Sequence, residues 1–417
     1  MISRLLILAD DLTGALDSGV QFAKNSIDVQ VLPSPETADL RGLRDSAVLV
    51  VNTGTRHSSP EEAYSVVTAT AKVFASHSFF YKKTDSCLRG NIGAELEALM
   101  KATGCSRLPF APAFPALKRF TRQGYQYLDA QLIHKSSMAK DSLNPITESF
   151  IPAIIARQSS IPVRLLTQKS AIPEPQNQRE ILVFDGETNS DIKNTANLLY
   201  ENDLLRVSAG CAGFAEALMH VLALDKKADE NSFKPIDNYP ILIISGSLHQ
   251  VSIEQVKAAQ NNDTAAFGLP GERILGPGWL DSKEAETLAE NCSRCLLEKG
   301  ISILGTEASL GMSRTKPEGS TEDISYALGE MVLKIIEKTG NLHLIVFGGD
   351  TLLGIVKTLR CKSLRPLDEI KPGIVLAKAE GQKSSGFLIT KAGAFGEKTL
   401  IAAIAKYFGR EAGDARV

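Results

Sequence analysis

The stretch "LADDLTGALDSG", residues 8–19, places two adjacent carboxylates directly after an apolar run. The run Leu5–Ala9 contains no polar residue, which is typical of a β-strand covered on both faces in a parallel sheet. Asp10 and Asp11 follow it, and Thr13-Gly14-Ala15 opens a helix predicted over Ala15–Lys24. In open α/β sheets this carboxyl edge is where ligands bind. Helix capping accounts for one aspartate but not obviously for both. Binding a substrate hydroxyl, holding a metal and accepting a proton are the other roles open to them.

Apolar runs alternate with amphipathic helical patterns through residues 1–224, as in "DSAVLVVNTGTR" followed by "PEEAYSVVTATAKVFASH". This alternation predicts a three-layer α/β domain with a mostly parallel sheet. Residues 225–240, "DKKADENSFKPIDNYP", are polar and carry two prolines, which indicates a linker. The alternation then resumes. We therefore predict two tandem three-layer α/β domains, 1–224 and 241–417, joined by the linker 225–240.

The composition excludes several classes of protein. A formal charge of −2 gives no electrostatic basis for binding nucleic acid or an anionic membrane. No apolar run approaches the length of a membrane span, and the chain enters its first strand with no signal peptide before it. Six scattered cysteines in 417 residues are typical of reduced thiols rather than a disulfide framework. These features predict a cytoplasmic protein.

Neither cysteine nor histidine spacing predicts a metal site. Cys292 and Cys295 form a C-x-x-C, but they lie within a helical pattern that ends at Gly300, with no second pair of ligands. Helix packing is therefore favoured over a redox or zinc motif. The six histidines are widely spaced and include no i, i+4 pair.

The loop "KKTDSCLRGN", residues 82–91, is the densest polar cluster, and it lies between an apolar strand and a helix. Lys83 offers a compact positive charge, Arg89 can bind a carboxylate through two nitrogens, and Asp85 can accept hydroxyl protons. A second cluster, which ends in Arg56, follows the preceding strand and would lie on the same sheet edge. Together they predict a pocket for a small, anionic, hydroxylated ligand. A solvated charged loop is the alternative.

Residues 111–149 follow the next strand and show little periodicity until their end. Segments this long without regular structure are uncommon inside compact domains and are often functional lids. We therefore predict a lid here. His134 lies in this segment and could touch substrate, although a surface position is favoured.

Three apolar runs of the second domain break into small residues just before a helix: "ILIISGS", "LIVFGGDT" and "LITKAGAFG". Glycines at such turns let backbone N–H groups approach an anion, and the following helix adds its positive end. Three such turns predict a phosphate cradle built by several loops, whereas any one alone is favoured as a plain tight turn. Neither G-x-x-x-x-G-K-[ST] nor G-x-G-x-x-G occurs, so a Walker-type NTPase and a standard dinucleotide fold are disfavoured.

These motifs, with "PAFPALKRFTRQGYQYLDAQLIHKSSMAKDSLNP" between them, occur in the order seen in the four-carbon acid sugar kinase family, which the chain resembles from residue 5 to about 400. The resemblance implies an N-terminal domain that binds a four-carbon sugar acid and a C-terminal domain that binds ATP. It implies transfer of the γ-phosphoryl group to the terminal hydroxyl of a threonate, erythronate or 3-oxo-tetronate type of substrate.

Site residues are carried over position by position. The chain departs from the family pattern in the polar stretch Lys135-Ser136-Ser137 of the predicted lid and at three single positions. Lys118 stands before Arg119 where Gly is usual, Leu352 stands where a small residue is usual, and Ala394 stands where a second Gly is usual. The implied substrate-binding residues are Asp10, Asp11, Thr13, Arg56, Lys83, Asp85, Arg89 and Gly90. The implied nucleotide-binding residues are Ser245, Ser247, Gly348, Gly349, Asp350, Thr351, Lys391, Gly393, Ala394, Phe395 and Gly396.

Enzymes catalyse phosphoryl transfer mainly by positioning the reactants and neutralising charge, and much less by covalent chemistry. We expect Arg89, Lys83 and Arg56 to hold the substrate carboxylate. Asp11 is the expected base, with Asp85 and Asp10 as alternatives, so the expected catalytic residues are Asp11, Asp85 and Arg89. Mg²⁺ is expected with the ATP phosphates, with Asp350 as a direct or water-mediated partner. Closure of the domains would exclude water.

Two other functions are weighed against the kinase. A sugar-acid dehydrogenase or isomerase would need a dinucleotide fingerprint or a metal cluster, and neither is visible. A non-catalytic sensor of a sugar acid or nucleotide would gain nothing from carboxylates on the sheet edge. The expected partners are a small-molecule sugar acid and ATP, with no nucleic acid and no membrane. The sequence leaves a homodimer open.

Overall fold

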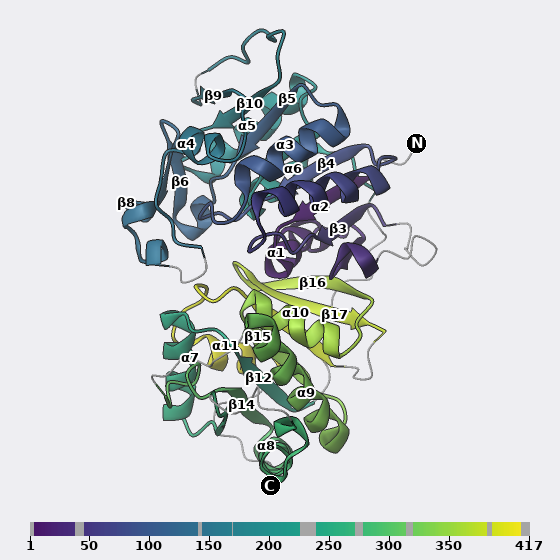
Figure 1. Ribbon diagram of the computed structural model, residues 1–417, viewed down its shortest axis with the longest axis vertical. Helices are drawn as coiled ribbons and strands as arrows, with labels where there is room; N and C mark the ends of the chain where they lie inside the picture. Colours follow the sequence, from purple (N-terminus) through teal and green to yellow (C-terminus); the bar gives the residue numbers. More distant parts are fainter. Residues whose placement is uncertain are drawn as a thin grey trace. The chain divides into compact units, whose positions relative to one another are not determined.

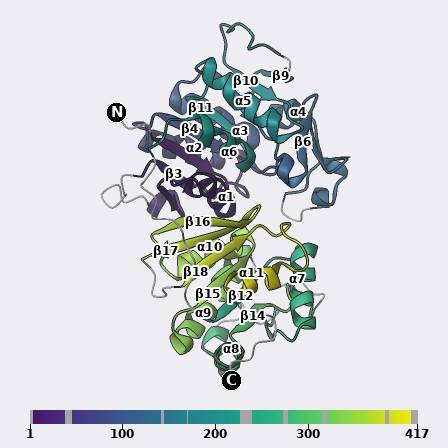
Figure 2. The same cartoon turned by 180° about the vertical axis from the view of Figure 1, so that it is seen from behind.

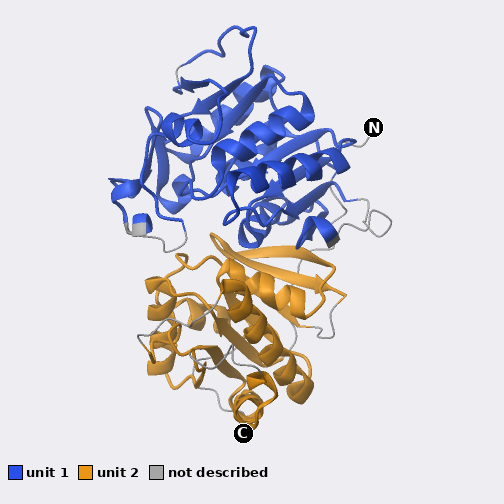
Figure 3. Cartoon of the chain, in the orientation of Figure 1, with its two compact units in different colours: residues 1–229 blue, residues 230–417 orange. Residues whose placement is uncertain are grey.

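The computed structural model describes residues 4–37, 46–140, 144–168, 170–225, 239–271, 278–313, 320–381 and 386–409. The chain divides into two compact units, residues 1–229 and 230–417 (Figure 3). The predicted linker 225–240 lies almost wholly outside the described residues. No described helix combines the length and the apolar character that crossing a bilayer requires.

Unit 1 is built on a parallel sheet in which the described strands follow the order β2-β3-β1-β4-β11-β5-β10-β9. Helices α2, α3 and α4 pack on the face to which Leu6 and Leu8 belong, while α1, α6 and α5 form the layer on the other face (Figures 1 and 2). This confirms the predicted α/β class. The strands are β1 (Leu5–Ala9), β2 (Val29–Leu32), β3 (Val48–Asn52), β4 (Phe79–Lys83), β5 (Arg107–Ala111), β9 (Val163–Leu166), β10 (Glu180–Phe184) and β11 (Val207–Gly210). The helices are α1 (Leu12–Ala23), α2 (Pro60–Val73), α3 (Ile92–Thr103), α4 (Ile151–Ala156), α5 (Asn189–Glu201) and α6 (Ala212–Val221).

Unit 2 has a mixed sheet with the order β13-β14-β12-β15-β18-β17-β16. The first five of these strands run parallel, and β17 and β16 continue the sheet antiparallel. Helices α7 and α11 cover one face, and α8, α9 and α10 pack together in the other layer (Figure 1). The strands are β12 (Ile241–Ser245), β13 (Ala266–Leu269), β14 (Ile301–Thr306), β15 (His343–Phe347), β16 (Ser363–Lys371), β17 (Ile374–Glu380) and β18 (Phe387–Lys391). The helices are α7 (Gln250–Asn261), α8 (Lys283–Lys299), α9 (Thr321–Thr339), α10 (Gly349–Thr358) and α11 (Leu400–Tyr407).

The segment 111–149 is more regular than its sequence suggested. It forms a three-stranded antiparallel sheet of β6 (Arg119–Arg122), β7 (Tyr125–Leu128) and β8 (Gln131–Leu132), followed by short 3₁₀ turns. The prediction of an irregular segment was therefore wrong. These strands are too short to show a clear period, and they are fixed by contacts made elsewhere: the Asp185 carboxylate accepts the backbone N–H groups of Gln123 and Gly124 at 2.7 and 2.9 Å.

The C-x-x-C lies on α8, as the helix-packing interpretation expected. Cys292 is fully buried there, and its thiol is free. Burial raises the pKa of the Cys292 thiol to about 12, so this cysteine is inert packing rather than a nucleophile.

Candidate active site

Asp11 is the residue that starts helix α1. Its carboxylate accepts the backbone N–H of Gly14 at 2.8 Å and the hydroxyl of Thr13 at 2.6 Å. The helix therefore begins at Leu12, three residues before the predicted start at Ala15. The capping interpretation holds for this aspartate of the pair, and the cap fixes its carboxylate at the carboxyl end of β1.

Arg56 binds both aspartates. Its Nε and Nη2 donate to Asp10 at 2.8 and 2.9 Å, and its Nη1 and Nη2 donate to Asp11 at 2.7 and 2.9 Å. The parallel pairing of β1 with β3 makes this contact, because it places Ala9 opposite Asn52 and so brings the two strand ends together. We expected Arg56 to hold a substrate carboxylate. The structure instead commits its guanidinium to the two aspartates.

Arg89 is engaged in the same way with Asp85. Its Nε and Nη2 donate to that carboxylate at 2.7 and 3.1 Å, and its backbone N–H donates at 3.2 Å. Burial alone would raise the pKa of Asp85, but the charges of Arg89 and Arg56 outweigh it and hold this pKa well below its usual range. Asp85 is therefore ionised and holds Arg89 in place. We expected Arg89 to bind a ligand carboxylate, but here its Nε and Nη2 donate to Asp85 instead.

The electrostatics of Asp11 are similar. Burial by itself would raise the pKa of its carboxyl group, but the Arg56 guanidinium and the Lys83 ammonium outweigh burial and hold this pKa below its usual range. Asp11 is thus ionised near neutral pH. It is a weak base, so it can accept a proton only as a transferring hydroxyl becomes acidic.

Lys83 is the cation of this edge that the protein leaves available. Lys83 is the last residue of β4 and is buried. Among the described residues, its ammonium forms neither a hydrogen bond nor an ion pair within 4 Å. A Cβ built at Gly14 would lie 2.7 Å from Lys83 Nζ and 2.5 Å from Asp11 Oδ1, so the ammonium lies directly beside the start of α1. Lys82 differs because successive strand residues point to opposite faces: its Nζ bonds the Leu8 and Lys83 carbonyls and pairs with Glu95 at 3.2 Å.

Gly14 is required by this close approach, which gives a first prediction. A Gly14→Ala substitution should push the Asp11 carboxylate or the Lys83 ammonium out of place, because both lie within 3 Å of the added methyl group. We expect a loss of about 1–3 kcal/mol in unfolding free energy and a weaker affinity for the ligand of unit 1. Thermal unfolding and ligand titration measure the two effects.

The matched control is Gly329→Ala on α9, where a built Cβ would lie 2.4 Å from Thr358 Oγ1 of α10. It should lower stability by a similar amount without changing affinity for the ligand of unit 1. Equal effects of the two substitutions on that affinity would contradict the placement of Gly14 in the site.

The remaining substrate-side residue is Gly90, and the loop around it is strained. Gly90 has φ +87°, a conformation that favours glycine, and Leu88 has φ +62°. Non-glycine residues in this region cost about 1–3 kcal/mol and cluster at functional sites. A Cβ at Gly90 would lie 3.3 Å from the Arg56 carbonyl oxygen, so Gly90 too lies with the other substrate-side residues at the carboxyl ends of β1, β3 and β4.

The sequence did not single out Arg119, which lies at the start of β6. Its Nη1 donates to Ser86 Oγ at 3.0 Å, and its charge helps to lower the pKa of Asp85. Gln126 on β7 donates to the Ser86 carbonyl at 2.9 Å. The small antiparallel sheet is therefore bonded to the loop at residues 82–91. The available signal was an arginine within the segment predicted to form a lid.

The departures from the family pattern have local explanations. Lys118 has φ +57°, which explains why Gly is usual there, and its exposed side chain pairs with Asp129 at 3.3 Å, away from the site. Leu352 is fully buried on α10 and serves the core. Ala394 keeps a negative φ, so its backbone conformation needs no glycine.

In unit 2 the three small-residue turns converge, as their adjacent parallel strands β12, β15 and β18 require. A Cβ at Gly393 would lie 2.6 Å from Ser247 Oγ, and one at Gly246 would lie 2.1 Å from Thr351 Oγ1. Gly348, the N-cap of α10, has φ +106°, and its Cβ would lie 3.5 Å from Cβ of Ser247. The three turns therefore form one cluster at the carboxyl edge of the sheet.

Other residues of this cluster have distinct positions. Gly349 and Asp350 belong to the first turn of α10, where Asp350 is half-buried. Ser245 is fully buried at the end of β12. The Phe395 ring lies against Gly373, and Gly396 has φ +81°. Within the described residues, no three His, Cys, Asp or Glu side chains gather in a way that could hold a metal ion.

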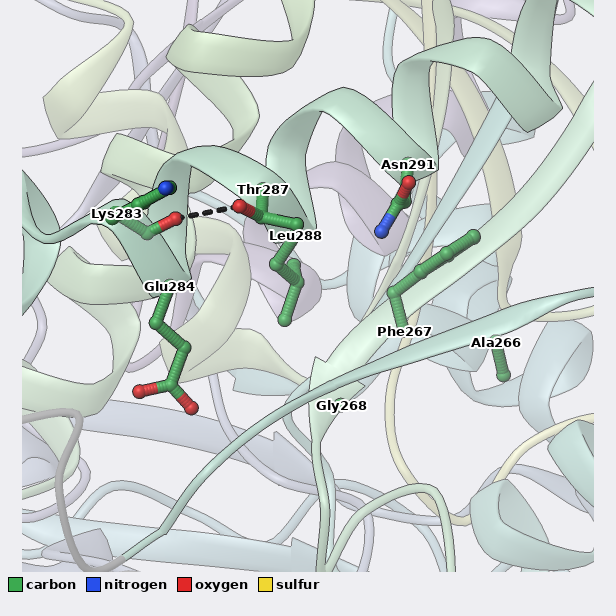
Figure 4. Close-up of a pocket in the computed structure, with 8 residues that line it drawn as sticks. All are labelled: Ala266, Phe267, Gly268, Lys283, Glu284, Thr287, Leu288 and Asn291. Atoms are coloured by element: carbon green, nitrogen blue, oxygen red, sulfur yellow. Dashed lines mark hydrogen bonds between the residues drawn. The ribbon is translucent and has the colours of Figure 1, made fainter.

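A cavity of about 580 Å³ lies elsewhere in unit 2, between β13 and α8 (Figure 4). Its lining combines Phe267 and Leu288 with the polar side chains of Lys283, Glu284 and Asn291. Figure 4 shows the Thr287 hydroxyl turned back to the Lys283 carbonyl, which it bonds at 2.7 Å. None of the residues predicted from sequence to bind a ligand lines this cavity.

Comparison with known proteins gives matches in both units. A family model described as "Sugar-binding N-terminal domain" matches residues 5–218, and one described as "Nucleotide-binding C-terminal domain" matches residues 242–401. The chain is 29% identical to a D-threonate kinase of Salmonella typhimurium, over 95% of this chain and 96% of that one. It is 25% identical to a D-erythronate kinase of Heliobacterium modesticaldum, over 89% of each chain. A crystal structure from Salmonella typhimurium LT2 superimposes with a TM-score of 0.75 at 20% identity, covering 98% of this chain and 100% of that one, which supports the fold.

Proposed function

Because the chain belongs to the four-carbon acid sugar kinase family, we propose that it transfers the γ-phosphoryl group of ATP to the terminal hydroxyl of an acid of the threonate, erythronate or 3-oxo-tetronate type. Unit 1 would bind the acid and unit 2 the nucleotide. Dehydrogenase, isomerase and sensor functions are disfavoured by the family.

The observation that carries this proposal is the pair formed by Lys83 and Asp11. A buried ammonium with no hydrogen bond of its own among the described residues lies beside an ionised carboxylate at the ligand-binding edge. A sugar acid has one group for each: a carboxylate for Lys83 and a hydroxyl for Asp11. A charge-assisted hydrogen bond to Lys83 would stabilise the bound acid by about 1.5–3 kcal/mol.

Asp11 would orient the reacting hydroxyl. Its four acceptor positions are filled here by Gly14, Thr13 and two bonds from Arg56. Of these donors, only the Thr13 hydroxyl can leave Asp11 by a simple rotation of its own side chain. A substrate hydroxyl can then take its place. We propose that the substrate hydroxyl takes this position and passes its proton to Asp11 late in the transfer, as the oxygen gains bonding to phosphorus.

In this proposal Arg56 and Arg89 are positioning residues. Arg56 fixes both Asp10 and Asp11, and Arg89 fixes Asp85, so the carboxylates keep their orientation without a ligand. Preorganised charges of this kind cost no rearrangement during the reaction.

On the nucleotide side, the clustered turns would hold the phosphates through backbone N–H groups. Magnesium would enter with ATP as part of the substrate. Asp350 suits this role, because a carboxylate in the first turn of α10 would otherwise repel the phosphates. Mg²⁺ commonly uses one or two carboxylates together with substrate phosphates and water.

The test is Mg·ATP-dependent ADP release with the D and L forms of threonate and erythronate and with their 3-oxo forms. One acid should stimulate release, and Lys83→Met should raise the KM for that acid by about ten- to a hundredfold, leaving the KM for ATP unchanged. Lys101→Met, an exposed lysine on α3, is the control and should change neither value. ADP binding without stimulation by any acid of the panel would exclude the proposed acceptor class.

A further inference from the structure

Lys391, the last residue of β18, is a buried ammonium with an unusual set of partners. Its Nζ donates to Ser252 Oγ at 3.0 Å, to the Gly393 carbonyl at 3.1 Å and to the Phe395 carbonyl at 3.3 Å. The same atom lies 4.3 Å from the centre of the Phe347 ring. A protonated lysine has three N–H donors. All three are therefore used, and the loop that follows the strand is bonded back onto its own lysine.

The loop is held from α7 as well. The Ser252 hydroxyl donates to the Gly393 carbonyl at 2.9 Å, and Gln255 Nε2 donates to the carbonyls of Phe395 and Glu397 at 3.0 Å each. Since Ser252 uses its single proton on Gly393, its oxygen can only accept from Lys391. All three bonds of Lys391 Nζ can be made at once only in the charged form of the lysine, because a neutral amine has two N–H donors.

That charge has no anion in its surroundings. Within the described residues no carboxylate lies within 4 Å of Lys391 Nζ. On α7, Glu254 pairs with Lys398 at 3.3 Å, and the His249 ring caps the helix at Val251 N. In the loop, Glu397 pairs with Lys371 at 3.9 Å. After β15, Asp350 belongs to the first turn of α10. A buried charge without a counter-ion is costly, and burial accordingly lowers the pKa of Lys391 to about 7.

We propose that Lys391 is a positioning residue, which holds the 393–395 turn through its two carbonyls and supplies a buried positive charge that the phosphates of a bound nucleotide balance. The lysine does not touch the phosphates, because its three donors are committed to the turn and to Ser252. This differs from direct binding, the role carried over to it from the family pattern. The inference rests on the proposed function of unit 2.

A measurable consequence is proton uptake on nucleotide binding. At pH 8 a group with a pKa of about 7 is mostly neutral. Phosphate charges placed near it favour the protonated form. Binding of ADP at this pH should therefore take up about 0.5–0.9 proton per protein. Titration calorimetry of ADP binding in two buffers of different ionisation enthalpy measures this number directly in the wild-type protein.

Two variants test whether Lys391 is the group that takes up the proton. Lys391→Met keeps the length of the side chain but removes its charge and donors, so it should abolish the uptake and raise the KM for ATP about tenfold or more, with the KM for the sugar acid unchanged. Lys398→Met, an exposed lysine seven residues further on, should leave the uptake and both KM values at the wild-type level. A merely structural role would lower stability without changing the proton number.

The outcomes separate this inference from the function on which it rests. ADP binding by wild type without proton uptake overturns the inference, and so does unchanged uptake in Lys391→Met. If Lys391→Met does not fold, the wild-type measurement still tests the inference, because absence of proton uptake overturns it. Failure to bind ADP at all would instead overturn the assignment of unit 2 as the nucleotide site.

Discussion

Asp11→Asn should lower kcat by about a hundred- to ten-thousandfold, the usual contribution of a positioned proton acceptor. The amide oxygen can still accept the Gly14 N–H, so α1 keeps its cap. The amide cannot take the hydroxyl proton, and it loses its ion pair with Arg56 at 2.7 Å. We therefore expect an additional loss of about 1–3 kcal/mol in unfolding free energy. ADP release and thermal unfolding measure the two effects.

Asp185→Asn is the matched control for this variant. Asp185 also follows a buried strand of unit 1, and its carboxylate also accepts two backbone N–H groups. It differs from Asp11 in forming no ion pair with Arg56. Its substitution should change stability modestly and leave kcat near the wild-type value. If Asp11→Asn kept kcat within about threefold, Asp11 would be only a cap and an anchor for Arg56, and another group would have to receive the proton.

Arg56→Met should destabilise the protein by about 3–5 kcal/mol, the range found when one partner is removed from a buried ion pair. Two aspartates would then lie next to each other without the guanidinium that makes four hydrogen bonds to them. Activity should fall as well, because Asp11 would lose its orientation. Chemical unfolding and kinetics on the folded fraction measure these losses.

The loss in stability should depend on pH. In the wild-type protein the pKa of Asp11 is held below its unfolded value, so its contribution is complete above about pH 4 and is lost as the pH falls through the lowered pKa. Without Arg56, burial would act to raise the pKa of the Asp11 carboxyl group instead. The unfolding free energy of Arg56→Met should then fall as the pH rises. The difference in unfolding free energy between wild type and variant should therefore be larger at about pH 8 than at about pH 5.

Arg107→Met controls for the loss of any buried arginine. Arg107 is as buried as Arg56, with 10% of its side chain exposed, and pairs with Glu180 at 3.0 Å at the opposite, amino end of the strands. It should lower stability without a specific loss of kcat. An Arg56→Met protein with wild-type stability at pH 8 would contradict the buried network described here.

Local patterns were sufficient for the fold class and for the sheet edges at which the candidate site residues meet. The run Leu5–Ala9 is a strand, and the polar residues that follow β1, β3 and β4 meet at one edge because parallel strands share their carboxyl ends. The turns at Ser247, Gly348 and Gly393 meet for the same reason. Local patterns did not predict the strands of segment 111–149. These strands show no clear hydrophobic period and are positioned by contacts with Asp185 and Ser86.

The sequence by itself determined which residue types stand at the two strand edges, because the periods of strands and helices place polar side chains at element ends. Only the tertiary structure decided which charges neutralise one another. Arg56 is 45 residues from Asp11, and Lys391 is 139 residues from Ser252. No local pattern specifies such pairs. They follow from the parallel register and from the packing that buries each group, so the different contacts of Arg56 and Lys391 became visible only in the tertiary structure.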